Sequence, residues 1–177
     1  EAQLELLSSK YSEQLNKYLS ARNDSETEQR TALISAINEL DTAKDLSAMS
    51  EEDLLAYIQK LDGIYGQYAA LLANLIPAEA QSKLFAECNR AVSAYCAKVM
   101  ATAEQLLEKL TDETAYSAMT VAQALELYEQ TAEFSEDHDL SDLEMNEILT
   151  TIPESYATVI YKVSYYAQYS GKAFKKF

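Results

Sequence analysis

The stretch LFAECNRAVSAYCAKVMATAEQLLEKL, residues 84–110, decides the fold class of this chain. Apolar residues recur in it at steps of three or four positions, and they span 26 residues in seven steps. This spacing is close to the 3.6-residue period of a straight α-helix and predicts one long helix over residues 78–110 with a buried face. The positions on that face are Leu84, Cys88, Val92, Tyr95, Val99, Ala103, Leu106 and Leu110.

The same periodicity predicts further helices over residues 2–21, 26–45, 51–76, 121–134 and 154–171, and a short one over 142–150. Capping patterns and prolines mark the breaks between them, and two glycines inside the third helix predict a bend or a close helix crossing. The capping pairs are Ser25 with Glu28, Ser50 with Asp53 and Thr120 with Gln123, the prolines are Pro77 and Pro153, and the glycines are Gly63 and Gly66.

The first helix carries a stripe of its own, formed by Leu4, Leu7, Tyr11, Leu15 and Tyr18, and each stripe is expected to face one compact interior. Three glycines and two prolines in 177 residues are too few for the turns of a β-sandwich or for a phosphate-binding loop. We therefore predict an all-α, antiparallel bundle of six to seven helices in a single domain over residues 1–177.

An internal repeat is visible in the order of these signals. Residues 46–50, LSAMS, match residues 116–120, YSAMT, and the Ile76-Pro77 pair matches Ile152-Pro153. We interpret this as two pseudo-repeats, 36–98 and 106–174, that share the long central helix.

Charge is distributed unevenly along the chain. The 14 Lys and Arg residues against 29 Asp and Glu residues give a net charge of −15, which disfavours nucleic acid and anionic lipid as partners. Residues 110–161 hold 12 acidic residues and no Lys or Arg. The row formed by Glu126, Glu129 and Glu133 is either a solvated helix face, a recognition surface for a basic partner, or a surface covered by the lysines of the C-terminal tail.

The chain begins at Glu1 rather than Met, which favours a removed leader and predicts a periplasmic, lipid-anchored or secreted protein. A cytoplasmic protein trimmed at Glu1 would look the same. No apolar run is long enough to predict a transmembrane segment, although a lipid anchor upstream of Glu1 is compatible with the sequence. Cys88 and Cys96 are too far apart along one helix to form a disulfide and are interpreted as small buried hydrophobes.

Residue types that bind metal ions or catalyse reactions are scarce in this sequence. The only histidine, His138, excludes a di-iron site and a three-histidine zinc site. Together with Asp137, Asp139 and Asp142 it could gather a hard cation, but the segment lacks the Gly and the final Glu of an EF-hand loop. We interpret residues 135–142 as a solvent-exposed acidic loop without metal, and we predict no enzymatic activity and no cofactor.

Five tyrosines lie in the last helix. Tyr156 shares core spacing with Val159, Ile160, Val163 and Ala167, whereas Tyr161, Tyr165 and Tyr169 form a second face at steps of four residues. The second face is either buried in the bundle or is an exposed strip that binds a partner or a second copy of the chain.

These features predict a non-enzymatic binding or structural module that engages another macromolecule through helical and acidic surfaces. The first alternative is a protein that binds a small ligand or cation in a cleft between long helices, with Tyr65, Tyr68 and Tyr95 as candidate lining. The second is a cytosolic acidic inhibitor or chaperone of a basic protein.

Overall fold

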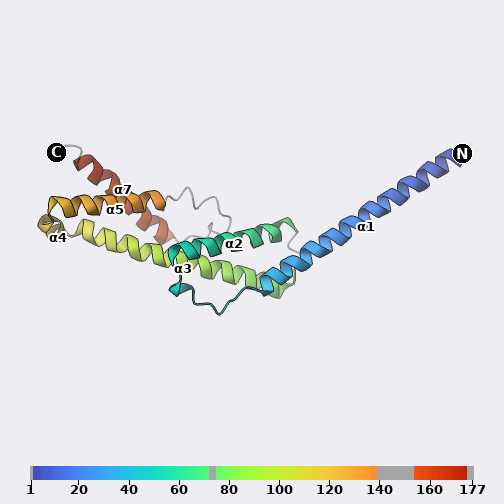
Figure 1. Cartoon of the computed structure of the whole chain (residues 1–177), viewed down its shortest axis with the longest axis horizontal. Helices are drawn as coiled ribbons and strands as arrows, with labels where there is room; N and C mark the ends of the chain where they lie inside the picture. The colour runs from blue at the N-terminus through green and yellow to red at the C-terminus, as the bar shows by residue number, and fades with distance from the viewer. Residues whose placement is uncertain (1, 72–74, 139–153, 175–177) are drawn as a thin grey trace. The chain divides into compact units, whose positions relative to one another are not determined.

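The computed structural model describes the backbone of residues 2–71, 75–138 and 154–174, and the side chains of residues 10–71, 75–115, 117–138 and 154–168. Six α-helices and one 3-10 turn form the regular structure of these segments, with no strand among them (Figure 1). This confirms the all-α class and the predicted number of helices. They are α1 (Ala2–Asn38), the 3-10 turn η1 (Leu46–Ala48), α2 (Glu51–Ala70), α3 (Ala78–Thr111), α4 (Glu113–Ala118), α5 (Val121–Asp137) and α7 (Glu154–Phe174).

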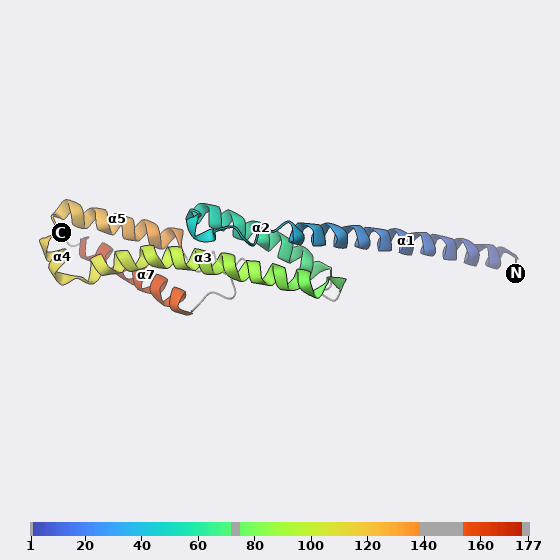
Figure 2. The same cartoon turned by 90° about the horizontal axis from the view of Figure 1, so that it is seen from below.

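Contacts within the chain gather into two compact units. Unit 1 comprises residues 1–42 and 63–85, and unit 2 comprises residues 43–62 and 86–177. Each unit has an apolar core, and in unit 2 helices α5 and α7 pack against each other (Figures 1 and 2). The prediction of a single domain over residues 1–177 stays a prediction. The unit 1 core contains Leu33, Ile37, Leu40, Ile64, Tyr68, Ile76, Ala80 and Leu84.

The break predicted at residues 23–25 is wrong, because α1 runs without interruption from Ala2 to Asn38. Asn, Asp and Ser lower helix propensity only moderately, and no Gly or Pro stands at this point. Arg22 Nε donates a hydrogen bond to Glu26 Oε1 at 2.8 Å across the predicted break. This pair supports a continuous helix and raises the pKa of Arg22. Ser25 is therefore an interior residue of the helix and not a cap, and the helix ends seven residues before the predicted end at residue 45.

The stripe predicted to be buried on the first helix is exposed where its side chains are described. Tyr11 is 70% exposed, Leu15 43% and Tyr18 65%, and every residue from 10 to 25 is exposed. Among the described side chains of this helix, the buried ones lie near its C-terminal end, at Leu33 and Ile37. Leu15 and Leu33 are separated by about five turns at 3.6 residues per turn, so the exposed and buried parts lie on one face of α1.

Two of the predicted helix starts are confirmed by their caps. Ser50 Oγ accepts from the Asp53 backbone N–H at 3.1 Å and donates to Asp53 Oδ2 at 2.7 Å. Thr120 Oγ1 accepts from the Gln123 backbone N–H at 3.3 Å, while Gln123 Oε1 accepts from the Thr120 N–H at 2.9 Å. These reciprocal bonds satisfy amides of the first helical turn that have no partner within the helix. Each capped helix follows a short helical turn, η1 or α4, although the repeat itself stays a prediction.

Helix α3 follows the sequence prediction almost residue by residue. It begins directly after Pro77 and ends at Thr111. Seven of the eight predicted positions are buried, and the eighth, Leu110, is half-buried. The buried positions are Leu84, Cys88, Val92, Tyr95, Val99, Ala103 and Leu106.

Helix α2 ends at Ala70 instead of residue 76 and continues as one helix through Gly63 and Gly66. A Cβ atom added at either glycine would meet no atom within 4 Å. The predicted close helix crossing at these glycines is therefore wrong.

Two further boundaries differ from the prediction. Helix α5 continues to Asp137, so the predicted loop over residues 135–142 is helical in its first part. The short helix α4 was not predicted, and Asp112 Oδ1 caps it by accepting from the N–H groups of Thr114 and Ala115 at 2.9 and 3.0 Å. The predicted helix over residues 142–150 lies outside the described residues.

Candidate functional site

Helix α7 has two apolar faces, one of which is buried while the other is exposed. Four of the five residues predicted to be core, Tyr156, Ile160, Val163 and Ala167, are buried at steps of four, three and four residues, and the fifth, Val159, is half-buried. On the opposite side Tyr161 is 70% exposed and Tyr165 is 46% exposed. The buried row fixes the helix in unit 2, and it thereby holds the exposed tyrosines on a rigid element.

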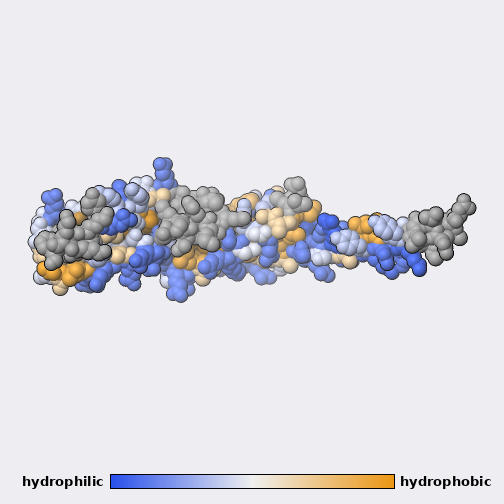
Figure 3. Space-filling model, turned by 90° about the horizontal axis from the view of Figure 1, so that it is seen from above, coloured by the Kyte–Doolittle hydropathy of each residue, from blue (hydrophilic) through white to orange (hydrophobic). Residues whose placement is uncertain are grey.

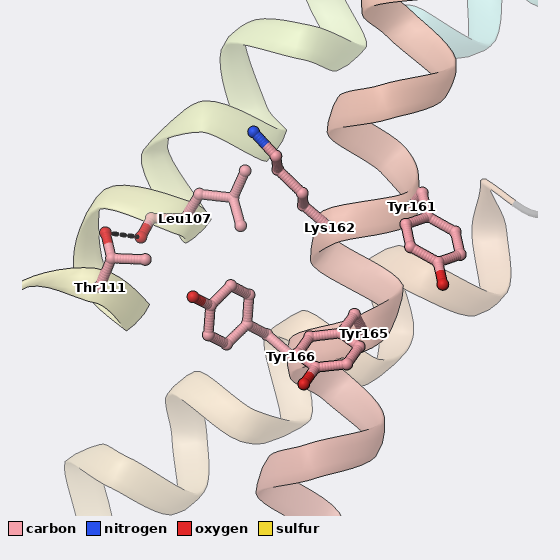
Figure 4. A pocket seen from close by; sticks show the side chains of 6 residues that line it. All are labelled: Leu107, Thr111, Tyr161, Lys162, Tyr165 and Tyr166. Carbon is pink, nitrogen blue, oxygen red and sulfur yellow. Dashed lines mark hydrogen bonds between the residues drawn. The ribbon is translucent and has the colours of Figure 1, made fainter.

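A pocket of about 560 Å³ opens between α3 and α7 in unit 2. In Figure 4, Lys162 and Tyr166 extend towards α3, whereas Tyr161 lies farthest from that helix. The rings of Tyr165 and Tyr166 meet edge to face, with centroids 5.8 Å apart at 84°, a favourable aromatic geometry. We call this site the tyrosine pocket, lined by Leu107, Thr111, Tyr161, Lys162, Tyr165 and Tyr166.

The lining of the tyrosine pocket combines flat apolar surface with a few polar groups. Thr111 Oγ1 donates to the backbone oxygen of Leu107 at 2.7 Å, which orients the hydroxyl and leaves its lone pairs to accept a hydrogen bond. Lys162 contributes a positive charge. Such a site suits a group with an aromatic or aliphatic body that offers a hydrogen-bond donor to Thr111 and an acceptor to Lys162. The six lining residues include no histidine or carboxylate, the usual bases that activate a hydroxyl nucleophile.

The structure brings together part of the predicted partner surface. Tyr161 and Tyr165 line the tyrosine pocket, while the side chain of Tyr169 lies outside those described. The predicted acidic row, Glu126, Glu129 and Glu133, lies on α5 and is exposed along its length. This row does not line the tyrosine pocket, so the two predicted surfaces are separate.

The prediction that His138 lies in a solvent-exposed loop is wrong. This residue is the C-cap of α5 and is only 6% exposed. Its ring stacks on Phe134, with centroids 4.1 Å apart. Its Nδ1 lies 2.7 Å from the backbone oxygen of Phe134, and its Nε2 lies 2.5 Å from Glu51 Oε1. Because a carbonyl oxygen can only accept, Nδ1 carries the proton of the first bond. The second bond places a proton between the ring and the carboxylate and ties α5 to the start of α2.

The hydrogen bonds of His138 bear on the cation site considered above, whose candidate ligands were His138, Asp137, Asp139 and Asp142. Both ring nitrogens of His138 are engaged, so neither is free to coordinate a metal ion. Asp137 lies exposed at the end of α5, and Asp139 and Asp142 lie outside the described residues. Among the described side chains, no three His, Cys, Asp or Glu residues are grouped so that they could hold a metal ion.

Two buried tyrosines lie near the Glu51–His138 pair. Tyr95 is 2% exposed and Tyr156 is fully buried, with ring centroids 6.5 Å apart. Burial, reinforced by the negative charge of Glu51, raises the pKa of Tyr95 to about 12. Burial also raises the pKa of Tyr156, whose hydroxyl has no well-formed hydrogen bond among the described residues. Both phenols are therefore neutral, structural groups at physiological pH.

The candidates predicted to line a ligand cleft are placed differently. Tyr65 and Tyr68 pack edge to face on Phe85 in unit 1, with centroids 6.0 and 5.5 Å from its ring. Tyr95 packs on Tyr156 in unit 2. Among the described residues, Tyr161, Tyr165 and Tyr166 of α7 line the pocket between α3 and α7.

Sequence reasoning missed one buried ionic group, Glu87, which is 1% exposed. Tyr57 Oη donates to its Oε1 at 2.6 Å, and Arg90 donates from Nε and Nη2 to its two oxygens at 2.9 and 2.7 Å. Arg90 Nη1 also donates to the backbone oxygen of Lys44 at 2.5 Å. The spacing of Glu87 and Arg90 on α3 hinted at a pair, but Tyr57 is 30 residues away and carried no signal.

The two cysteines are both free and buried, which confirms their interpretation as small apolar residues. Burial raises the pKa of Cys88 and of Cys96 to about 11, so both thiols are protonated near neutral pH.

Comparison with known proteins adds no identity: no family model matches the sequence, and neither a curated protein nor a solved structure shows significant similarity. Within the described segments, no helix has the length and hydropathy needed to cross a membrane.

Proposed function

We propose that this chain is a non-enzymatic binding module that recognises another protein through the tyrosine pocket and its exposed rim. The observation that carries the proposal is the exposure of Tyr161 and Tyr165 on a helix whose opposite face is buried. Two large aromatic side chains next to a pocket form a surface that a partner can cover.

Tyrosine suits this role for physical reasons. Its ring offers a large contact area with only two side-chain torsions to fix, so little entropy is lost when a partner covers it. The adjacent Lys162 adds a charge that would favour an acidic or acceptor group of the partner at the same place. The pocket beside the rings can receive one side chain of that partner as an anchor.

The double variant Tyr161→Ser with Tyr165→Ser tests the proposal. Because both side chains are exposed, helix content and melting temperature should remain unchanged, whereas binding should weaken by at least about 30-fold, the effect of losing an interface hot spot. Affinity capture from the source cells, followed by titration calorimetry with the captured protein, measures this loss. Leu75→Ser is the control, since Leu75 is a large apolar side chain that is 48% exposed and does not line the tyrosine pocket. Unchanged binding by the double variant, or its unfolding, would contradict the proposal.

The volume of the tyrosine pocket favours a small organic ligand as the second candidate function. Thr111→Trp separates the two, because an indole at this exposed position of α3 would fill the pocket without removing a tyrosine. A small ligand would then be lost in a thermal-shift screen, whereas a protein that contacts the outer rings of Tyr161 and Tyr165 would still bind.

A further inference from the structure

We infer that the contact between Glu51 and His138 is a pH-sensitive link, which closes when the pair holds a proton and opens when that proton leaves. The closed link joins the start of α2 to the C-terminal end of α5, across 87 positions of the sequence. Both residues belong to unit 2, and neither lines the tyrosine pocket, so the inference is independent of the proposed function.

The two ring nitrogens of His138 each face an oxygen. Nδ1 lies 2.7 Å from the backbone oxygen of Phe134, and Nε2 lies 2.5 Å from Glu51 Oε1. A neutral imidazole carries one N–H, so it can donate to only one of these oxygens, and its other nitrogen would then face an oxygen lone pair. When Glu51 is ionised, both contacts therefore need a second proton on the ring. A protonated Glu51 would serve equally, and in either form the closed link holds one proton between the two side chains.

The surroundings of the ring make the loss of this proton unfavourable for the closed link. His138 is 6% exposed, and its ring stacks on Phe134 with centroids 4.1 Å apart, so water does not readily replace a lost partner. The side chain of Glu51 is 33% exposed, so its carboxylate can turn towards water. We therefore expect the deprotonated link to open by separation of Glu51 from the end of α5.

Titratable and charged groups near the link come from each helix packed around it. Lys98 on α3 favours release of the proton, because its ammonium group donates to the backbone oxygen of Met49, two residues before Glu51. The C-terminal end of α5 and the neighbouring carboxylates favour a cationic ring and so favour retention of the proton. Among the described residues, these groups are Glu52 and Asp53 on α2, Tyr95, Cys96 and Lys98 on α3, Asp137 on α5 and Tyr156 on α7.

His138 is the only histidine of the chain, which allows an effect of pH to be assigned to one side chain. Hydrophilic residues cover much of the surface that is visible in Figure 3. The acidic and basic ones among them ordinarily keep their charge between pH 5 and 8, whereas imidazole is the group that ordinarily exchanges its proton in this range. The link is therefore tested between these two pH values.

The direction of the effect follows from the number of protons in each state. At neutral and alkaline pH the closed link holds one proton more than the open pair, so closure weakens as the pH rises. The body of α5 should stay in place, because Leu127 and Phe134 are buried and Ser135 Oγ donates to Ser164 Oγ on α7 at 2.9 Å. The movement should therefore be confined to the last turn of α5 and the first turn of α2.

Nuclear magnetic resonance of the unmodified chain tests the link, because a single histidine gives a single set of ring signals. Between pH 5 and 8, the amide protection factors of residues 134–138, corrected for the intrinsic exchange rate, should fall at least about fivefold, the effect of losing one buried hydrogen bond. This fall should follow the loss of one proton from the pair, and protection in the middle of α3 should stay constant.

Glu51→Gln distinguishes a proton-dependent link from an ordinary structural contact. The glutamine amide can donate to Nε2 of a neutral ring, so both ring nitrogens have partners without an additional proton. The protection factors of this variant should change less than about twofold over the same pH range. Glu52→Gln is the matched control, since it removes the same charge from the next, exposed position of α2, and it should show the fall of the unmodified chain.

Two results would each overturn the inference. The first is constant protection at the end of α5 in the unmodified chain between pH 5 and 8. The second is a fall in the Glu51→Gln variant that equals the fall in the unmodified chain. Because the first measurement needs no variant, it decides the question even if Glu51→Gln alters the fold.

Discussion

Helices α1 and α3 are the longest of the described helices, with 37 and 34 residues, and both carry an apolar stripe at helical spacing. The stripe of α3 is buried over nearly its whole length, whereas α1, in its described part from residue 10 onward, is exposed at Tyr11, Leu15 and Tyr18 and buried at Leu33 and Ile37. Periodicity therefore predicts which face of a helix needs cover. It does not predict which segment provides the cover, because that segment is distant in sequence.

Side-chain hydrogen bonds connect α3 to segments that are distant in the sequence. Lys83 Nζ donates to the backbone oxygen of Asn38 at 2.8 Å, and Lys98 Nζ donates to that of Met49. These bonds join α3 to residues more than 40 positions earlier in the chain. In the exposed part of α1, the bonds from Lys17 to Glu13 and from Arg22 to Glu26 connect residues four positions apart on the same helix.

The largest expected effect comes from removing a side chain from each stripe. Leu84→Ala on α3 should lower the free energy of unfolding by about 2–5 kcal/mol, because Leu84 is fully buried and its loss leaves a cavity. Leu15→Ala on α1 should change it by less than about 0.5 kcal/mol, since that side chain is already hydrated. Urea denaturation at low protein concentration measures both. A large loss for Leu15→Ala under these conditions would mean that α1 is covered within one chain, and the contrast between the helices would disappear.

The same contrast explains how much of the fold could be predicted from sequence. Helix class, the caps at Ser50 and Thr120 and the α3 stripe depend on residues within a few positions of each other, and these predictions are confirmed. The predicted break at Ser25 failed because weakly unfavourable residues did not outweigh an uninterrupted helical segment. The burial of His138 could not be predicted, since it depends on Glu51, which is 87 positions away.

The candidate site, like the fold, could be predicted only where it depends on residues close together in the sequence. The local spacing on α7 allowed a buried or an exposed second face, and the structure shows Tyr161 and Tyr165 exposed, while their role in binding stays a prediction. The other wall of the tyrosine pocket, Leu107 and Thr111, lies on α3 about 50 positions earlier and had no sequence signal. A pocket between two helices is a tertiary feature, so only its half on α7 could be predicted.

A smaller loss of stability is expected at alkaline pH, where buried tyrosines should differ from exposed ones. The pKa of Tyr95 is about 12 in the folded chain but about 10 when unfolded, so its stabilising contribution is complete below pH 10 and lost as the pH rises towards 12. The shift corresponds to about 2–3 kcal/mol. The buried thiols of Cys88 and Cys96, with pKa values of about 11, act in the same direction and extend the loss to lower pH.

Melting temperatures measured between pH 8 and 12 test this prediction. Tyr95→Phe should retain a larger fraction of its pH 8 stability at pH 11 than the unmodified chain does. The exposed Tyr161→Phe should follow the unmodified chain. Equal pH profiles for all three proteins would show that Tyr95 is not the group that resists ionisation.

The smallest expected effect concerns the exposed side of α2, where a change in helix propensity should alter stability without altering side-chain packing. Gly63 and Gly66 are exposed within this helix, and a methyl group at either position would meet no atom within 4 Å. Alanine loses less backbone entropy than glycine when a helix forms, so each Gly→Ala change should stabilise the chain by about 0.5–1 kcal/mol. The double variant should raise the melting temperature by about 3–6 °C, measured by circular dichroism. Ala69→Gly, at an exposed position of the same helix, should lower stability by a similar amount per site. If Gly63→Ala destabilised the chain instead, this face of α2 would have to be covered in the folded protein, as the stripe of α3 is.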